Sequence, residues 1–364
     1  MTRVVRLFWT TIILLFISNI KADAQAIPQS RVGVQYYKGF ILKHSPDIGH
    51  LITYHPDGVE VFYEKHLSGT EDWHAAYGYP WVGHSLSYFS LGNEVLGDIL
   101  AASTYMSFPF WQNKGIQIRG EIGTGLGFAT RPYDPETNNQ NTILGSRFSV
   151  QMRGAINTQW QINPNWQARL NVGITHFSNG AIRLPNKGIN LVSANIGLQK
   201  TIQYTEKPSP PTSSAHEKEW QYSFLLQLGR SQAQPMGRAV KPFITFQSYA
   251  GWRANAKSSW LIGGDYFINW AIKESLEQSF FLRGQTKPDF KRIGLTLGHE
   301  LHLGDLSLLT QVGYYVYEKL PQKDILYQRY GLRYQWYQNI SINMFLKTHA
   351  AKAEALEWGL GIRI

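Results

Sequence analysis

Cysteine is absent from this 364-residue chain, and charged residues make up only 16% of it. Without thiols the chain has no disulfide, no thiolate metal site and no cysteine nucleophile. No run of 18 apolar residues follows the N-terminal segment, which leaves the sequence without a candidate membrane-crossing helix. What it has instead is 33 glycines, 20 tyrosines and 12 tryptophans. This composition is typical of an exported bacterial envelope protein.

The N-terminal segment has the order of a secretory signal. Two early arginines precede an apolar stretch, and the small residues Ala22-Asp23-Ala24 then fit an A-x-A cleavage site. We therefore expect residues 1–24 to be a signal peptide, with a buried helix or anchor as the alternative. Residues 1–24 are left out of the fold prediction.

The rest of the chain alternates between apolar and polar residues with a period of two. In residues 166–178 the even positions are mostly apolar, and the odd positions carry Gln, Arg and Asn. Alternate residues of a strand lie on opposite faces. Such segments run about 11 to 15 residues, longer than the usual 5–6 of globular strands and long enough to cross a bilayer when tilted. The pattern predicts an outer-membrane β-barrel with an apolar outer wall and a hydrated interior.

We predict an all-β fold, a transmembrane antiparallel β-barrel of about 14–16 strands. One break is evident, the Pro/Ser-rich stretch "KPSPPTSSAHEK" within residues 206–218, which we expect to be a loop or linker. It separates a first barrel region, residues 25–205, from the remaining strands of residues 219–364. A single large barrel is favoured, and the alternative is an eight-stranded barrel plus a second β unit.

Residues of the types found in active sites lie close together at the end of the predicted strand 166–178. "NPN" before this strand reads as a tight periplasmic turn, so the strand rises outward. His176 and Ser178 then lie at the outer rim on the lipid-facing side, and Asn190 begins the next strand on the same face. Polar groups facing lipid need partners or a function. The sequence therefore predicts a site here.

These residue types fit ester hydrolysis. The imidazole of His176 can take the proton of Ser178 while the hydroxyl attacks a carbonyl, and Asn190 can hold the ring through its amide oxygen. Donors for an oxyanion are available in the following loop from Asn179, Gly180 and Asn186. The alternative is a set of rim residues that only hydrogen-bond to lipid head groups.

The net charge of +10 favours an anionic partner. Arg183, beside the predicted site, is a candidate for binding lipid phosphates, with ordinary solvated loop charge as the alternative. We expect lipid A or lipopolysaccharide of the outer leaflet as the partner of a membrane-embedded protein, and no nucleic acid. We expect neither a metal nor a cofactor: "GHELHLG" (298–304) lacks the H-E-x-x-H spacing of a zinc helix.

The segment "HFSNGAIRLPNKGIN" resembles the motif of the outer-membrane lipid A 3-O-deacylases, the PagL-like family. The resemblance implies a β-barrel of the bacterial outer membrane that hydrolyses an ester-linked 3-hydroxyacyl chain of lipid A without metal. It implies His176 as general base, Ser178 as nucleophile, and Asn179 and Asn186 near the oxyanion. The family's catalytic glutamate is replaced by Asn190 here. A non-enzymatic pore or lipopolysaccharide-binding barrel is the competing hypothesis.

Overall fold

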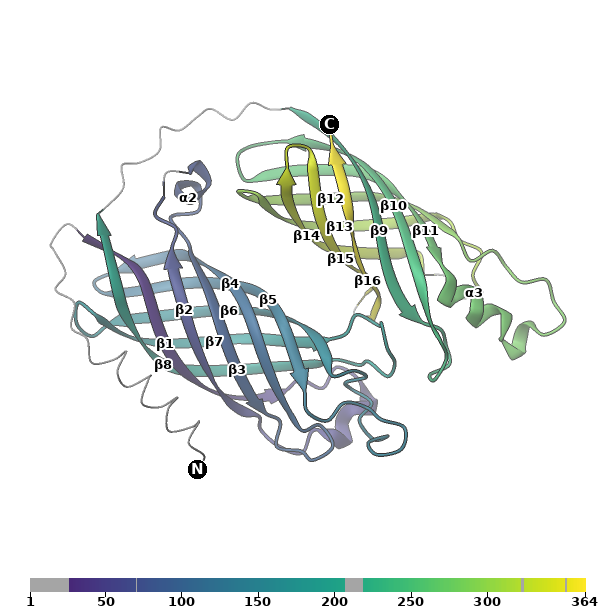
Figure 1. Ribbon diagram of the computed structural model, residues 1–364, viewed down its shortest axis with the longest axis horizontal. Coiled ribbons are helices and arrows are strands. Elements are labelled where there is room, and N and C mark those ends of the chain that lie inside the picture. The colour runs from purple at the N-terminus through teal and green to yellow at the C-terminus, as the bar shows by residue number, and fades with distance from the viewer. Residues whose placement is uncertain (1–25, 70, 207–218, 322–323, 351) are drawn as a thin grey trace.

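The protein consists of two closed antiparallel barrels of eight strands each, one formed by β1–β8 and the other by β9–β16 (Figure 1). This computed structural model describes residues 26–69, 71–206, 219–321, 324–350 and 352–364. The predicted signal peptide lies outside the described residues, and so does the predicted linker apart from Glu206. Among the described residues, no helix is long and apolar enough to cross a membrane.

The first barrel is built from strands of 10 to 18 residues. The strands are β1 Ala26–Ile41, β2 Asp57–His66, β3 Trp81–Ser90, β4 Asp98–Asn113, β5 Ile116–Ala129, β6 Phe148–Gln161, β7 Trp166–Ser178 and β8 Ile189–Glu206. A 3-10 helix, η1 (Pro46–Leu51), lies between β1 and β2, and helix α2 (Asp72–Ala76) lies between β2 and β3.

The second barrel uses strands of 10 to 14 residues. The strands are β9 Trp220–Gln232, β10 Val240–Arg253, β11 Ser258–Asn269, β12 Arg292–Leu303, β13 Leu306–Tyr317, β14 Leu326–Tyr337, β15 Ile340–His349 and β16 Lys352–Arg363. Helix α3 (Trp270–Glu277) and the 3-10 helix η2 (Phe280–Leu282) lie between β11 and β12.

The expectation of a single large barrel is wrong, and the alternative with two β units is the arrangement found. β1 pairs with β8 along most of its length, and β9 pairs with β16. Each set of eight strands thereby satisfies its own edges, because closure leaves no unpaired edge strand. The predicted all-β antiparallel barrel fold and the predicted strand number are confirmed, with sixteen strands among the residues that the structure describes.

The two faces of each strand follow the alternation seen in the sequence. In β7 the outward side chains Val172 and Ile174 are 54% and 42% exposed, while the inward Arg169 and Asn171 are 1% and 0% exposed. The outward residues of β9 show the same pattern. Apolar outer walls of this kind suit the hydrocarbon region of a bilayer.

The interior of the first barrel is filled by side chains, so the expected hydrated interior is wrong for the described residues. The Arg169 guanidinium lies 2.9 Å from Glu64 and 2.5 Å from Glu121. Tyr105 donates a hydrogen bond to Glu64 at 2.9 Å. An eight-stranded barrel is only wide enough for its own side chains, and here these form a buried ion-pair network.

Candidate active site at one rim of the first barrel

The predicted site residues meet at the rim of the first barrel that carries the β7–β8 loop, which we call the motif rim. The opposite rim carries the short β4–β5 and β6–β7 turns and is called the turn rim. His176 and Ser178 end β7, and His176 pairs in register with Asn190 of β8. Both β7 side chains continue the outward face of the strand and are half-buried by the adjoining loops.

A chain of hydrogen bonds holds the His176 ring. His176 Nδ1 donates to Asn190 Oδ1 at 2.7 Å. Asn190 Nδ2 in turn donates to Nδ1 of His44, at 3.1 Å. The other nitrogen of His44, Nε2, donates to the Lys187 carbonyl at 2.9 Å. With its proton on Nε2, the His44 ring accepts from the Asn190 amide on Nδ1, which sets the amide oxygen toward His176; the same Nδ1 lies 3.2 Å from the Leu42 carbonyl. The His176 tautomer that results has a bare Nε2.

Two donors surround the Ser178 hydroxyl. The Gly180 backbone N–H donates to Ser178 Oγ at 3.2 Å, and Asn186 Nδ2 donates to it at 2.8 Å. Asn186 is oriented by its own oxygen, which accepts from the Asn179 backbone N–H at 3.2 Å. A backbone N–H and an oriented amide that converge on one oxygen are the donor set that an oxyanion hole requires.

Asn179 and Arg183 differ in what they can reach. The Asn179 amide is buried and donates to Ser146 Oγ and to the Arg183 carbonyl, so its side chain braces the loop. The Arg183 side chain is exposed on the outside of the loop. Of the predicted donors, Gly180 and Asn186 therefore contact the serine, and Arg183 is free to bind a group outside the barrel.

His176 and Ser178 are neighbours without a direct hydrogen bond between them in the described chain. Such contacts are often long in the absence of substrate and tighten on binding. The space beside the ring is limited by Gly188, where an added Cβ would lie 2.8 Å from His176 Cε1 and 3.4 Å from Nε2. The absent side chain at position 188 leaves the reactive side of the imidazole uncovered.

His44 is the residue that sequence reasoning missed. It lies 146 residues from Asn190, in the loop after β1. The signal that could have found it is barrel closure: Ile41, at the end of β1, pairs with Leu191 at the start of β8. A first barrel closed at eight strands puts the residues after β1 beside Asn190.

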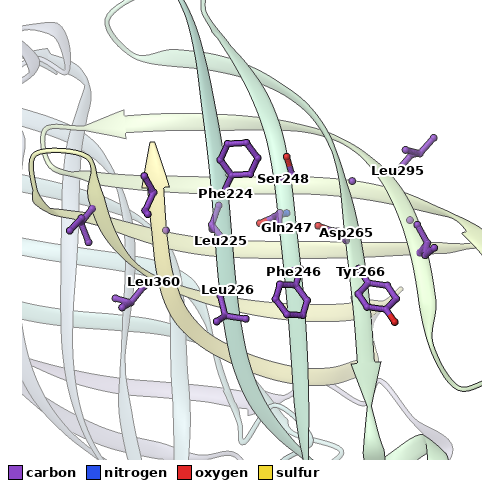
Figure 2. Close-up of a pocket in the computed structure, with 16 residues that line it drawn as sticks. Phe224, Leu225, Leu226, Phe246, Gln247, Ser248, Asp265, Tyr266, Leu295 and Leu360 are labelled. Carbon is purple, nitrogen blue, oxygen red and sulfur yellow. The ribbon is translucent and has the colours of Figure 1, made fainter. Parts of the chain in front are cut away.

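A separate hollow of about 690 Å³ lies on the wall of the second barrel (Figure 2). Its lining is mostly apolar and includes Phe224, Leu226, Phe246, Tyr266 and Leu360. None of the predicted site residues lines it. Its lining also includes Ser248 and Asp265. Asp265 is buried and engaged by Arg329 and Tyr327, and no histidine in the described part of the chain lines the hollow. The candidate active site is therefore the cluster at the motif rim.

Comparison with known proteins gives two family matches. Residues 57–199 match a family model described as lipid A 3-O-deacylase (PagL), and residues 220–364 match one described as acyloxyacyl hydrolase, C-terminal domain. Each barrel thus matches a model of the PagL family of lipid A deacylases. The first match covers most of the first barrel and contains His176, Ser178 and Asn190, and the second covers the second barrel. A lipid A deacylase family and two barrels with apolar outer walls place the protein in the bacterial outer membrane.

Three solved structures that resemble this chain share between 9% and 17% sequence identity with it. The crystal structure of the outer membrane enzyme PagL has 17% identity and a TM-score of 0.32, covering 45% of this chain and 97% of that one. Neisserial surface protein A has 9% identity and a TM-score of 0.31, covering 49% and 99%. A mutant of the Rh. blastica porin has 10% identity and a TM-score of 0.20, covering 92% and 99%. None of the curated proteins compared with the chain matches it.

Proposed function

We propose that this protein is a serine esterase that removes an ester-linked 3-hydroxyacyl chain from lipid A in the outer leaflet. The observation that carries the proposal is Ser178, which receives hydrogen bonds from Gly180 and Asn186 and stands two residues from a histidine held by Asn190. The family match supports the substrate class. The lipid-facing side of β7 supports access from the membrane.

The first half of the reaction forms an acyl-enzyme. Ser178 Oγ attacks the ester carbonyl while His176 Nε2 takes the hydroxyl proton. Negative charge develops on the carbonyl oxygen, and the Gly180 N–H and the Asn186 amide, which donate to Ser178 Oγ before the reaction, are the donors proposed to stabilise it. His176 then gives its proton to the sugar oxygen as the ester bond breaks.

The second half releases the fatty acid. Water loses a proton to His176 and attacks the acyl-serine, and Ser178 leaves with that proton. Asn190 keeps the imidazole oriented in both halves and accepts the Nδ1–H throughout. An amide stabilises the imidazolium less than a carboxylate does, so we expect slower turnover than an acid at this position would give.

Substrate binding combines the membrane with the loop. Acyl chains of lipid A reach the site along the apolar outer face of β7, and its phosphates face the aqueous rim. We propose that the exposed Arg183 binds a phosphate there, because guanidinium groups bind phosphate oxygens with two parallel hydrogen bonds.

The decisive test is mass spectrometry of lipid A from a Gram-negative host that expresses the wild type, Ser178→Ala or Ser259→Ala. Ser259 is a matched control, since its Oγ lies 2.8 Å from His302 Nε2 but is buried inside the second barrel. We expect loss of one hydroxyacyl mass with the wild type and Ser259→Ala, and unchanged lipid A with Ser178→Ala. Unchanged lipid A with a correctly folded wild type would instead favour a non-enzymatic lipopolysaccharide-binding barrel.

A further inference from the structure

The second barrel contacts the catalytic loop of the first through the last residue of β9. Gln232 Oε1 accepts a hydrogen bond from the Leu184 backbone N–H at 2.6 Å, and the Gln232 N–H donates to the Ala181 carbonyl at 3.4 Å. The Gln232 amide is itself fixed, because its Nε2 donates to the Arg238 carbonyl at 2.7 Å. The β7–β8 loop is therefore tied to a preorganised group of the other barrel.

The β7–β8 loop, which Gln232 holds, also carries the backbone N–H that donates to the nucleophile Ser178. Gly180, whose N–H donates to Ser178 Oγ, packs so closely on β16 that an added Cβ would lie 3.0 Å from Leu356 Cβ. The next residue, Ala181, has a φ of 65°, a left-handed conformation that is unfavourable for a residue with a side chain. A loop in such a conformation needs support from its surroundings, and Gln232 bonds to Ala181 directly.

A second contact lies at the opposite rim and fixes the relative orientation of the barrels. Lys257, in the β10–β11 turn, lies 4.9 Å from the centre of the Tyr77 ring, beside α2. At Gly304, in the β12–β13 turn, an added Cβ would lie 2.6 Å from Trp73 Nε1 of α2. Figure 1 shows α2 projecting from the rim of the first barrel, near the second barrel. The β10–β11 and β12–β13 turns of the second barrel thus lie at the turn rim of the first barrel, and the end of β9 lies at its motif rim. Both barrels therefore cross the membrane in the same direction.

From these contacts we infer that the second barrel is a positioning element for catalysis, with Gln232 holding the loop that presents Gly180 and Asn186 to the reacting oxygen. The inference rests on the proposed esterase function and assigns a role to residues 220–364. Gln232 acts through the loop and is a positioning residue.

The contact between the β7–β8 loop and Gln232 is tested first. Because the chain contains no cysteine, only the introduced cysteines can react with the crosslinker. Ala181→Cys combined with Gln232→Cys should crosslink with a short bismaleimide in intact outer membranes. Ala181→Cys combined with Gln221→Cys, at the other end of β9, should not. Failure of the first pair to crosslink in folded protein overturns the inference.

The catalytic role is tested with the full-length protein on purified lipid A. Gln232→Leu removes the acceptor for Leu184 and should lower kcat about tenfold with KM within about twofold, since one backbone hydrogen bond is lost at the loop. Gln232→Glu keeps the oxygen acceptor for Leu184 but loses the donor to the Arg238 carbonyl, so its kcat should lie between those of Gln232→Leu and the wild type. Gln221→Leu is the matched control, because Gln221 lies on the same strand and donates to Glu219 at 2.5 Å, at the turn rim.

The outcomes separate the two proposals. Equal kcat for Gln232→Leu and Gln221→Leu overturns the inference while the esterase function stands. The same loss with Gln232→Leu and Gln232→Glu also overturns it, because the acceptor would then not be the cause. A fully folded wild type without activity overturns the esterase function and this inference with it. Folding is checked by heat-modifiable electrophoretic mobility.

Discussion

Asn190 lies between two histidines, and this arrangement decides whether an amide can replace a catalytic acid. A carboxylate offers two equivalent oxygens to the imidazole, whereas an amide offers one oxygen and two N–H groups. The amide works only in one of its two orientations, and His44 selects that orientation by accepting from Nδ2 at 3.1 Å. We therefore expect His44 to matter because residue 190 is an asparagine.

A double-mutant cycle tests this dependence. His44→Ala should lower kcat about fivefold to tenfold, the worth of one neutral hydrogen bond, because the amide can then turn its N–H groups toward His176. In the Asn190→Asp background the carboxylate needs no orientation, and His44→Ala should change kcat by less than about twofold. Asn190→Asp alone should raise kcat. The hypothesis fails if His44→Ala costs the same in both backgrounds.

Ser259 and His302 show why a serine beside a histidine is not enough. Their side chains are 3% and 4% exposed, and Glu300 nearby is occupied by Arg333 at 3.1 Å and Arg363 at 2.8 Å. A buried serine that faces the interior of a filled barrel cannot meet a lipid ester. Ser178 lies on the outward face of β7, whereas Ser259 lies on the inward face of β11. Alternate residues of a strand point to opposite faces, so a shift of one position changes the face.

At the level of elements, the sequence predicts the individual strands and the candidate site residues on β7 and β8 better than it predicts how the strands close into barrels. The alternation in residues 166–178 indicates β7 and the outward direction of His176, because period-two patterning is a local property. The pairing of β1 with β8 is non-local, and "KPSPPTSSAHEK" is compatible with either a loop in one barrel or a connection between two. The role of His44 depends on that closure, and the contact of Gln232 depends on how two barrels meet. Neither has a local signal.

The β7–β8 loop gives a prediction about Gly188. Gly188 has a φ of 75° and lies against His176, whereas Gly237 in the β9–β10 loop has a φ of 91° and open space around its Cβ position. Alanine at either position meets the cost of a left-handed backbone, about 1 kcal/mol. Only Gly188→Ala also displaces the catalytic ring, so it should reduce kcat more than tenfold while Gly237→Ala stays close to wild type. Lipid A deacylation rates, measured on folded protein, compare the two variants, and equal rates would contradict the steric argument.

At the scale of the whole molecule, filled interiors argue against a pore. Both barrels close at eight strands, and each interior contains buried ion pairs, such as Arg329 with Glu357 at 2.5 Å in the second. In the part of each barrel that the structure describes, charged side chains that satisfy one another across a narrow barrel leave no continuous path for water. We therefore expect the function to depend on the outer walls and rims.

A further prediction concerns the ion-pair network of the first barrel. Arg169→Met leaves Glu64 and Glu121 buried without this partner, and removing one member of a buried network costs about 3–5 kcal/mol. Arg147→Met, the same substitution at an exposed position of the first barrel, should change the free energy of unfolding by less than about 0.5 kcal/mol. Urea unfolding followed by tryptophan fluorescence measures both. An unchanged unfolding free energy for Arg169→Met would contradict a barrel interior held by these charges.

A filled interior also predicts that planar-bilayer recordings of the wild type show no porin-like conductance steps. Such steps would contradict a barrel interior closed by these side chains.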